Sequence, residues 1–253
     1  MRFKLFILCL LLSVTVNGQV KPFKAGEEFT MGLMFKWGAV NTEVAVATVK
    51  LDSLSYEGTP AYHTNCFVKT APFFDVFFKM REDFHSWFTA DGMKPLKFIR
   101  DTYEGGYTAT NLYIYDWPAK LIHADVNFGD SGPQKLEIPL HDKVFDLPSL
   151  IYYFRTLDMS KHRPGEKFPF SFAIDDAVFD IALTYHGKEQ TYIRKQGKRA
   201  TEHFSCSVVS GAMFDGNQEV QIWLSDDAYH VPVALRVPLR WGSLQAWIKT
   251  YEP

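Results

Sequence analysis

The sequence lacks the motifs that identify several large functional classes. Its three cysteines form no Cys-x-x-Cys pair, so a thiol-redox motif is absent. None of its eight histidines falls in a His-Glu-x-x-His or His-x-His spacing, and no EF-hand or glycine-rich phosphate-binding loop occurs. Positive charge is not in excess, because 27 basic residues stand against 29 acidic ones, whereas nucleic-acid binding needs clustered cationic surface. We therefore expect no catalytic residue, no metal, no cofactor and no nucleic-acid partner.

Long apolar runs are also scarce. The run from Leu5 to Leu12 is too short for a membrane span, which needs about 20 residues. Two basic residues precede it and Val16-Asn17-Gly18 follows it, which predicts a signal peptide over residues 1–18 with cleavage before Gln19. Cys9 lies inside the apolar run and is preceded by bulky residues, where a lipoprotein signal has small ones. We expect an exported protein, periplasmic or secreted, with no transmembrane segment in the mature chain.

Period-two alternation of apolar residues recurs along the mature chain and is typical of half-buried strands. One such face consists of Phe29, Met31, Leu33, Phe35 and Trp37. The strand runs are separated by turn-forming pairs, namely Glu57-Gly58, Asp91-Gly92, Gly105-Gly106, His186-Gly187, Gln196-Gly197 and Asp215-Gly216. We predict an all-β, mainly antiparallel fold, in which residues 19–253 form a single domain. Its sheet must be strongly curved, or an open barrel, to hide its edges.

Two segments predict short helices. Residues 146–158 have apolar side chains at helical spacing, and Asp146 is placed to cap the N-terminus. The predicted apolar face consists of Leu147, Leu150, Ile151, Phe154 and Leu157. The second segment, Ala71 to Met80, carries four phenylalanines after Pro72. We expect both helices to lie against the curved sheet.

The chain also resembles an exported bacterial family known as domain of unknown function 3108. The resemblance covers nearly the whole mature chain. Its C-terminal part lies in Trp223–Asp227, His230–Val233, Val237–Leu239 and Gly242–Ser243, and further segments are Phe77–Lys79, Pro95–Asp101, Glu104–Tyr107, Asp146–Leu150 and Tyr152–Asp158. The resemblance implies export and fold but no activity. The expected architecture is also similar to that of Lol-type periplasmic lipoprotein carriers.

Aromatic residues are abundant, at 22 Phe, 12 Tyr and 6 Trp. Several tryptophans fall on the strand face opposite the one expected to be buried, so a curved sheet would need a cover on both faces. We predict that a lipid or acyl chain binds in the concavity, contacted by Phe73, Phe74, Phe77, Phe78, Phe84, Phe88, Trp223 and Trp247. Three alternatives stay open: the two helices alone fill the concavity, the protein is an enzyme acting on envelope polysaccharide or lipid, or it is a structural or partner-binding module.

Three smaller features have alternative interpretations. Cys66 and Cys206 either pair in an oxidising compartment or act as buried thiols. The segment Gly129-Asp130-Ser131-Gly132-Pro133 copies the surroundings of a chymotrypsin-like serine, but its glycines and proline favour a turn. The basic residues around Gly197 form a predicted hairpin tip that could touch anionic lipid headgroups, giving a candidate peripheral membrane contact.

Export can be tested at the N-terminus. Because the charged start and short apolar run predict a cleaved signal peptide, protein isolated from its own host should begin at Gln19 when its N-terminus is sequenced. A retained Met1, or a lipid on Cys9, would contradict this.

Overall fold

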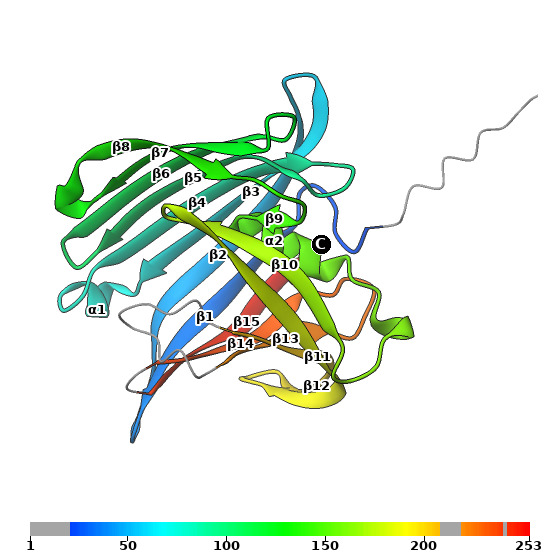
Figure 1. Cartoon of the computed structure of the whole chain (residues 1–253). Helices are drawn as coiled ribbons and strands as arrows, with labels where there is room; N and C mark the ends of the chain where they lie inside the picture. The colour runs from blue at the N-terminus through cyan, green and yellow to red at the C-terminus, as the bar shows by residue number, and fades with distance from the viewer. Residues whose placement is uncertain (1–20, 208–218, 240–241) are drawn as a thin grey trace, which may run out of the picture.

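The computed structural model describes residues 21–207, 219–239 and 242–253, which contain one large sheet and two short helices (Figure 1). The strands are β1 (Glu28–Trp37), β2 (Val40–Tyr56), β3 (Thr59–Thr70), β4 (Met80–Thr89), β5 (Pro95–Glu104), β6 (Tyr107–Asp116), β7 (Leu121–Phe128), β8 (Pro133–Pro139), β9 (Val144–Phe145), β10 (Lys167–Ile174), β11 (Ala177–Ile193), β12 (Gly197–Ser207), β13 (Glu219–Ser225), β14 (Pro232–Pro238) and β15 (Ser243–Glu252). The helices are α1 (Pro72–Asp75) and α2 (Leu147–Arg155), with 3-10 turns η1 (Gly129–Ser131) and η2 (Met159–Lys161). The predicted signal peptide and the Asp215-Gly216 turn lie outside the described residues.

The strands follow one another across a 15-stranded sheet in the order β8-β7-β6-β5-β4-β3-β2-β1-β15-β14-β13-β12-β11-β10-β9. Neighbouring strands are antiparallel except β9 and β10, which are parallel. The chain therefore starts in the middle of the sheet, runs out to one edge, crosses over, and returns until β15 pairs with β1. The first and last strands of the chain thus hold the two halves of the sheet together.

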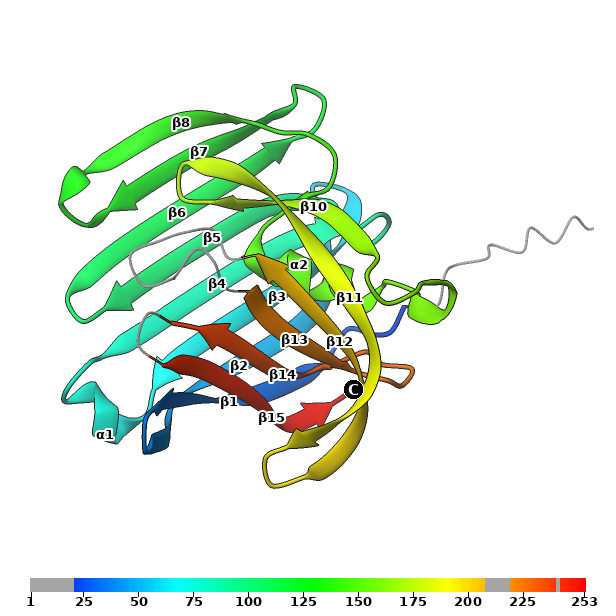
Figure 2. The ribbon, with the colours of Figure 1, turned by 60° about the horizontal axis from the view of Figure 1, so that its bottom comes forward.

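The sheet curves until its edges approach each other, but it does not close (Figures 1 and 2). The edge strands β8 and β9 meet through side chains instead of ladder hydrogen bonds. Ile138 of β8, Val144 of β9 and Ala173 of β10 are buried in one apolar cluster. Only Ile138 of β8 is buried in this contact, so β8 stays a largely exposed edge strand, and its prolines at both ends, Pro133 and Pro139, limit pairing with other chains. The predicted all-β, mainly antiparallel, strongly curved fold is confirmed.

Helix α2 lies inside the curve, enclosed between the two halves of the sheet (Figures 1 and 2), and contacts β3 and β4. As predicted, Asp146 caps it: its Oδ1 accepts from Ser149 N at 3.0 Å, within a capping box. Its Oδ2 accepts from Ser86 Oγ on β4 at 2.9 Å, so the cap also ties the helix to the sheet. Burial raises the pKa of Asp146 to about 6.

The prediction of one apolar helical face is partly wrong. Leu150 and Phe154 are buried, but Leu147 is exposed. Tyr152 and Arg155, which fall outside the predicted face, are completely buried. The reason is that sheet surrounds the helix on both sides, so its polar face is buried as well.

Arg155 is neutralised by Glu27 in the segment that precedes β1. Their side chains form a two-pronged pair, with Nη1 2.5 Å from Oε1 and Nη2 2.7 Å from Oε2. Tyr251 Oη on β15 donates to Glu27 Oε2 at 3.0 Å, and Arg155 Nη2 also donates to the backbone oxygen of Tyr229 at 3.0 Å. The pair therefore joins the N-terminal segment, α2, β15 and the β13–β14 turn.

The expected helix over Ala71–Met80 is reduced to the single turn α1. Asp75 accepts a hydrogen bond from Thr70 and pairs with Arg81, Nη2 to Oδ2 at 2.5 Å. These contacts join the ends of β3 and β4 and leave too few residues for a longer helix, whose nucleation is costly.

Two smaller predictions are also resolved. Cys66 and Cys206 are free thiols, so the alternative of pairing is wrong, and burial raises the pKa of Cys66 to about 12. Gly129–Ser131 forms the turn η1, as its glycines indicate. Among the described residues, no helix has the length and apolar character to cross a membrane.

The helix gives a matched stability test. Leu150→Ala should lower the free energy of unfolding by ~2 to 5 kcal/mol, because it removes buried methyl groups from the core. Leu147→Ala, on the exposed side of the same helix, should change it by no more than about 0.5 kcal/mol. Urea denaturation measures both, and equal effects would contradict the packing described.

Candidate functional site

The end of the sheet that carries α1, here named the open end, has an inner face that is only half-buried. Nearer to α2, inner side chains such as Phe88 and Leu51 are fully buried. Toward the open end, Val68, Phe84 and Leu244 pack on the core but remain half-buried. These three residues come from both halves of the sheet, so the described part of the open end forms an incompletely covered apolar wall.

Phe84 belongs to an aromatic and cationic group on this wall. Its ring stacks on Phe98 of β5, with centroids 6.3 Å apart and planes 15° apart. The guanidinium of Arg100 lies 6.0 Å from the Phe84 centroid. Arg100 Nη1 in turn donates to Asp175 Oδ1 at 2.8 Å, which docks the β10–β11 turn against the wall.

A hydrogen-bonded row of polar side chains continues from Arg100 toward the open end. Arg100 Nε donates to Thr102 Oγ1 at 2.7 Å, and Thr102 Oγ1 donates to Glu82 Oε2 at 2.6 Å. Glu82 is only 7% exposed, and its second oxygen, Oε1, has no hydrogen-bond partner among the described residues. Burial raises the pKa of Glu82 to about 7, assisted by the nearby Glu104 carboxylate and opposed by Thr102 and Arg100.

Asn111 of β6 presents a second buried acceptor. Its Nδ2 donates to Tyr113 Oη at 3.0 Å, and Tyr113 Oη donates to the backbone oxygen of Asp175 at 2.6 Å. Asn111 Oδ1 is buried without a partner in the described residues. A buried polar oxygen without a donor costs about 1 to 3 kcal/mol. Each of the two oxygens is therefore a buried acceptor without a donor in the described part of the chain.

The structure does not bring the eight predicted ligand residues together. Phe84 lies on the inner wall, but Phe88 is part of the filled core, where its ring packs against Tyr62 and Tyr152. Lipid binding by these residues stays a prediction, and Phe84 is the member best placed for it.

The two predicted tryptophans lie on the other face of the sheet. Trp223 and Trp247 are in register on either side of Ala234, which is buried, and both are half-buried against the margin of the core cluster. The row that alternates with them contains Phe204 and Ala246, and Trp223 Nε1 donates to the exposed Glu189 at 2.5 Å, so the tryptophans project from the face opposite that row. Trp223 stacks on His203 at 4.7 Å. This agrees with the expectation that tryptophans occupy the face opposite the core, but it separates them from Phe84.

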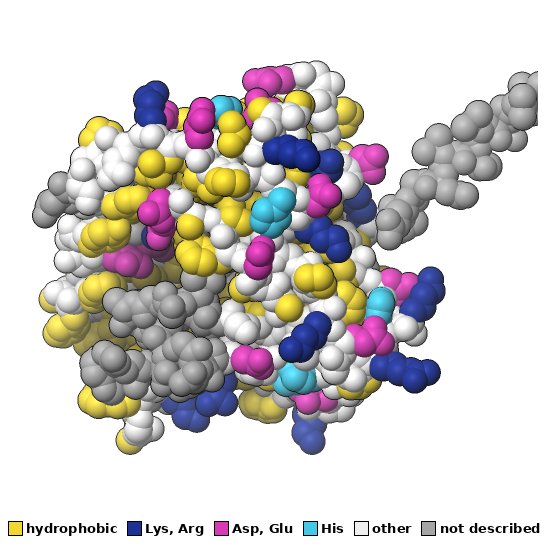
Figure 3. All heavy atoms as spheres, in the orientation of Figure 1, with side chains coloured by type: hydrophobic (Ala, Val, Ile, Leu, Met, Phe, Trp, Pro, Cys, Tyr) yellow, Lys and Arg dark blue, Asp and Glu magenta, His cyan; other side chains and the backbone are white. Residues whose placement is uncertain are grey.

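The remaining four residues form the α1 segment at the open end. Phe73, Phe77 and Phe78 are exposed and Phe74 is half-buried. In Figure 3, hydrophobic side chains gather on the left of the molecule, the side on which Figure 1 places α1. The segment therefore forms an exposed rim and not a cover packed onto the wall.

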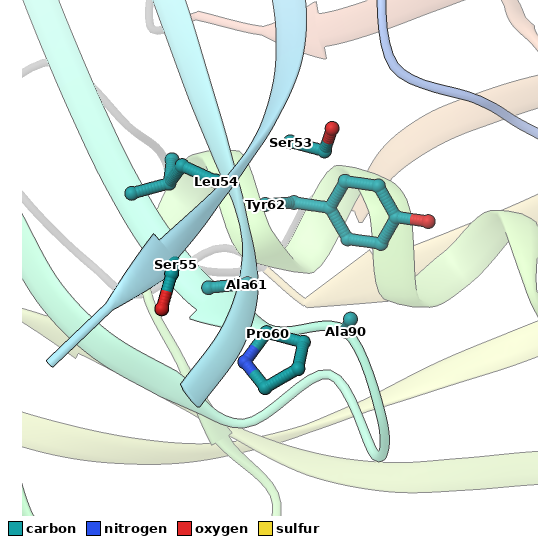
Figure 4. A pocket seen from close by; sticks show the side chains of 7 residues that line it. All are labelled: Ser53, Leu54, Ser55, Pro60, Ala61, Tyr62 and Ala90. Atoms are coloured by element: carbon teal, nitrogen blue, oxygen red, sulfur yellow. The ribbon is translucent and has the colours of Figure 1, made fainter. Parts of the chain in front are cut away.

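Two surface depressions lie elsewhere. One, of about 340 Å³, is lined by β2, β3 and Ala90 near the opposite end, where the Tyr62 ring extends toward α2 (Figure 4). The other, of about 490 Å³, lies over β6, β7 and β8 and includes Ile114, His123 and Glu137. Neither is lined by a predicted ligand residue. No group of three or more potential His, Cys, Asp or Glu metal ligands occurs in the part of the chain that is described.

Sequence reasoning missed Glu82, Arg100 and Asn111. A signal was present, because Glu82 shares the alternating face of β4 with Phe84, Ser86 and Phe88. A charged residue in the middle of a buried strand face is uncommon unless it is paired or functional.

The raised pKa of Glu82 predicts a pH-dependent stability. Its folded pKa of about 7 exceeds the usual value of about 4.3, so the protonated carboxyl stabilises the fold below about pH 4 and this stabilisation is lost as the pH rises through about 7. Glu82→Gln cannot ionise. Its free energy of unfolding relative to wild type should therefore rise by about 1 to 3 kcal/mol between pH 4.5 and pH 8. Urea denaturation of both proteins at each pH measures this difference.

The matched control is Glu57→Gln, on an exposed side chain in the turn between β2 and β3. It should leave the pH dependence of stability unchanged. If the stability of Glu82→Gln relative to wild type is the same at both pH values, the pKa of Glu82 is not raised by folding and the prediction is wrong.

Comparisons with known proteins identify a family without an assigned activity. A family model described as "Protein of unknown function (DUF3108)" matches residues 29–249. A crystal structure of a β-barrel-like protein of domain of unknown function DUF1849 from Brucella abortus is similar in fold, with a TM-score of 0.56, 9% identity, and coverage of 90% of this chain and 97% of that one.

A crystal structure from Parabacteroides distasonis, described provisionally as a lipoprotein, matches with a TM-score of 0.31 and 6% identity over 92% of this chain and 97% of that one. No curated protein matches significantly. Because the family model covers most of the sequence, the chain belongs to the DUF3108 family of proteins of unknown function.

Proposed function

We propose that the protein is an exported, non-enzymatic component of the cell envelope that binds the apolar chain of a lipid against its inner wall and contacts the membrane peripherally. The observation that carries this proposal is the half-buried apolar wall around Phe84, next to two buried acceptors that lack donors. Export is supported by the signal peptide that the sequence predicts over residues 1–18. Residues 19–253 are proposed to act as a single domain.

The chemistry of the wall favours a particular kind of lipid. Val68, Phe84 and Leu244 offer apolar surface for an acyl chain. Asn111 Oδ1 is always an acceptor, and Glu82 Oε1 is an acceptor only once the carboxyl is ionised. The two oxygens therefore match a headgroup with hydroxyl donors. An anionic headgroup fits less well, because Asp175 already occupies the neighbouring cation, Arg100.

The test uses a soluble neutral amphiphile. A monoacylglycerol below its aggregation limit, at about 100 times its Kd, should stabilise the folded protein by about 2.7 kcal/mol. For a chain of this length each kcal/mol raises the Tm by roughly 2 to 4 °C. Native mass spectrometry of protein purified from its own envelope should show a retained lipid of the same class.

Matched variants locate the binding surface. Phe84→Ala should reduce the ligand-induced rise in Tm, because it removes half-buried surface from the inner wall. Phe67→Ala is the control, since Phe67 is also half-buried but pairs with Asp83 on the opposite face of β3 and β4. If neutral and anionic single-chain lipids all leave the Tm unchanged and no lipid is retained, the proposal is wrong.

A further inference from the structure

The α1 segment at the open end exposes an unusual amount of apolar surface. Phe73, Val76, Phe77 and Phe78 are 71%, 82%, 75% and 50% exposed. We name these four residues the phenylalanine lip. Single exposed apolar residues are ordinary, but a contiguous group of this size marks an interaction site. The rings of Phe73 and Phe77 lie 5.7 Å apart and form one exposed patch, and Val76 and Phe78 belong to the same short segment.

The lip is held outward by its supports. The ion pair between Asp75 and Arg81 fixes the turn of α1 to β4, and Met80 N donates to Thr70 Oγ1 at 3.0 Å. The Phe78 ring lies so close to Gly105 that a β-carbon at that position would be 2.7 Å from it. Collapse of the lip into the concavity would break these contacts, so its exposure is built into the fold.

A second exposed aromatic residue lies at the same end of the sheet as the lip. Trp37, at the end of β1, is 59% exposed. Figures 1 and 2 place the β1–β2 turn and α1 at this same end, with the turn projecting beyond α1 in Figure 1. Tryptophan is enriched at the level of lipid headgroups, where its ring is apolar on one side and wet on the other. Trp37 and the phenylalanine lip can therefore contact the same membrane surface.

Exposed lysines outnumber the unpaired carboxylates around this surface: Glu43 is paired with Lys249 at 2.6 Å, and Glu104 at the end of β5 is half-buried. Lys36, Lys69 and Lys79 are exposed on the elements that carry Trp37 and the lip. The one acidic residue within α1, Asp75, is neutralised by Arg81. A basic rim around exposed aromatic residues is complementary to an anionic bilayer, because each lysine near such a surface is attracted by about 1 kcal/mol. Protein interfaces, in contrast, are depleted of lysine at their cores.

We propose that the phenylalanine lip and Trp37 insert into the headgroup region of an anionic lipid bilayer, with Lys36, Lys69 and Lys79 contacting the phosphates. This proposal names the surface through which the proposed function would meet the membrane. It rests on the proposed function only in one respect, namely that lipid binding explains why the protein would need the membrane contact. Docking places the open end of the sheet, with its apolar wall, next to the bilayer.

The test is co-flotation of the mature protein with vesicles of phosphatidylcholine alone or mixed with phosphatidylglycerol. Wild-type protein should float with the anionic vesicles. The double variant Phe73→Ser, Phe77→Ser should bind at least tenfold more weakly, with an unchanged Tm because both side chains are exposed. The double variant Lys69→Gln, Lys79→Gln should lose the preference for phosphatidylglycerol.

The control is Tyr192→Ser, an exposed aromatic at the far end of β11, beside the basic hairpin around Gly197. It should float like wild type, and loss of flotation there would assign the contact to that hairpin instead. Absence of wild-type flotation, or equal flotation of the Phe73→Ser, Phe77→Ser variant, overturns the proposal. A dimer that this variant dissociates would assign the lip to a second copy of the chain.

The soluble-lipid measurement separates the two proposals. It needs no vesicle, and the Phe73→Ser, Phe77→Ser variant leaves the inner wall intact. A protein that binds monoacylglycerol but no vesicle refutes docking and the membrane contact, and leaves lipid binding at the inner wall standing. A protein that floats but gains no stability from any soluble lipid refutes lipid binding at the inner wall and leaves docking standing.

Discussion

The buried ion pair between Arg155 and Glu27 is the interaction on which the closed half of the structure depends. Neither side chain reaches solvent, and removing one partner from such a pair costs about 3 to 5 kcal/mol because the other charge is left buried. Arg155 comes from α2 and Glu27 from the N-terminal segment. Arg155 also donates to the backbone oxygens of Pro22 and of Tyr229 in the β13–β14 turn, and Tyr251 of β15 donates to Glu27. Segments from both ends of the chain therefore have to be in place together.

Anchoring α2 in this way divides the interior of the curved sheet. On the side of the helix the concavity is filled, since Tyr152 packs against Phe23 and Phe88 in a continuous set of rings. On the other side the wall is half-buried and contains Glu82 and Asn111. Helix α2 thus fills one part of the concavity and borders the other. The sequence had suggested either filling by the helices or a ligand in the concavity, and the structure is compatible with both. The helix occupies one part of the concavity, and any ligand is restricted to the open end.

Local patterns predicted the strands, the capped helix and the mainly antiparallel curved sheet, because alternation and capping are properties of neighbouring residues. They could not predict which residues share a site. Trp223 and Phe84 are both aromatic residues in alternating strands, and their separation onto opposite faces depends on the register of every strand pair from β13 through β15 and β1 to β4. The single turn of α1 likewise depends on the ion pair between Asp75 at its end and Arg81 in β4. Glu82 did carry a sequence signal, its place on the alternating face of β4, but its link to Arg100 through Thr102 depends on pairing with β5.

The open end combines two departures from ordinary folding rules. Apolar side chains of the phenylalanine lip face solvent, while Glu82 Oε1 and Asn111 Oδ1 are buried without donors among the described residues. Each departure lowers stability, and neither can relax locally: the ion pair of Asp75 holds the lip outward, and Arg100, bonded to Thr102 and Asp175, holds the polar row in place. Natural proteins retain such conflicts mainly at functional sites. Asn127, Tyr152 and Glu202 also carry a buried oxygen without a partner in the described residues, but only at the open end do such oxygens occur together with the exposed phenylalanine lip. This coincidence is the reason for proposing an amphiphilic partner there, with the bilayer covering the lip and a lipid headgroup reaching the acceptors.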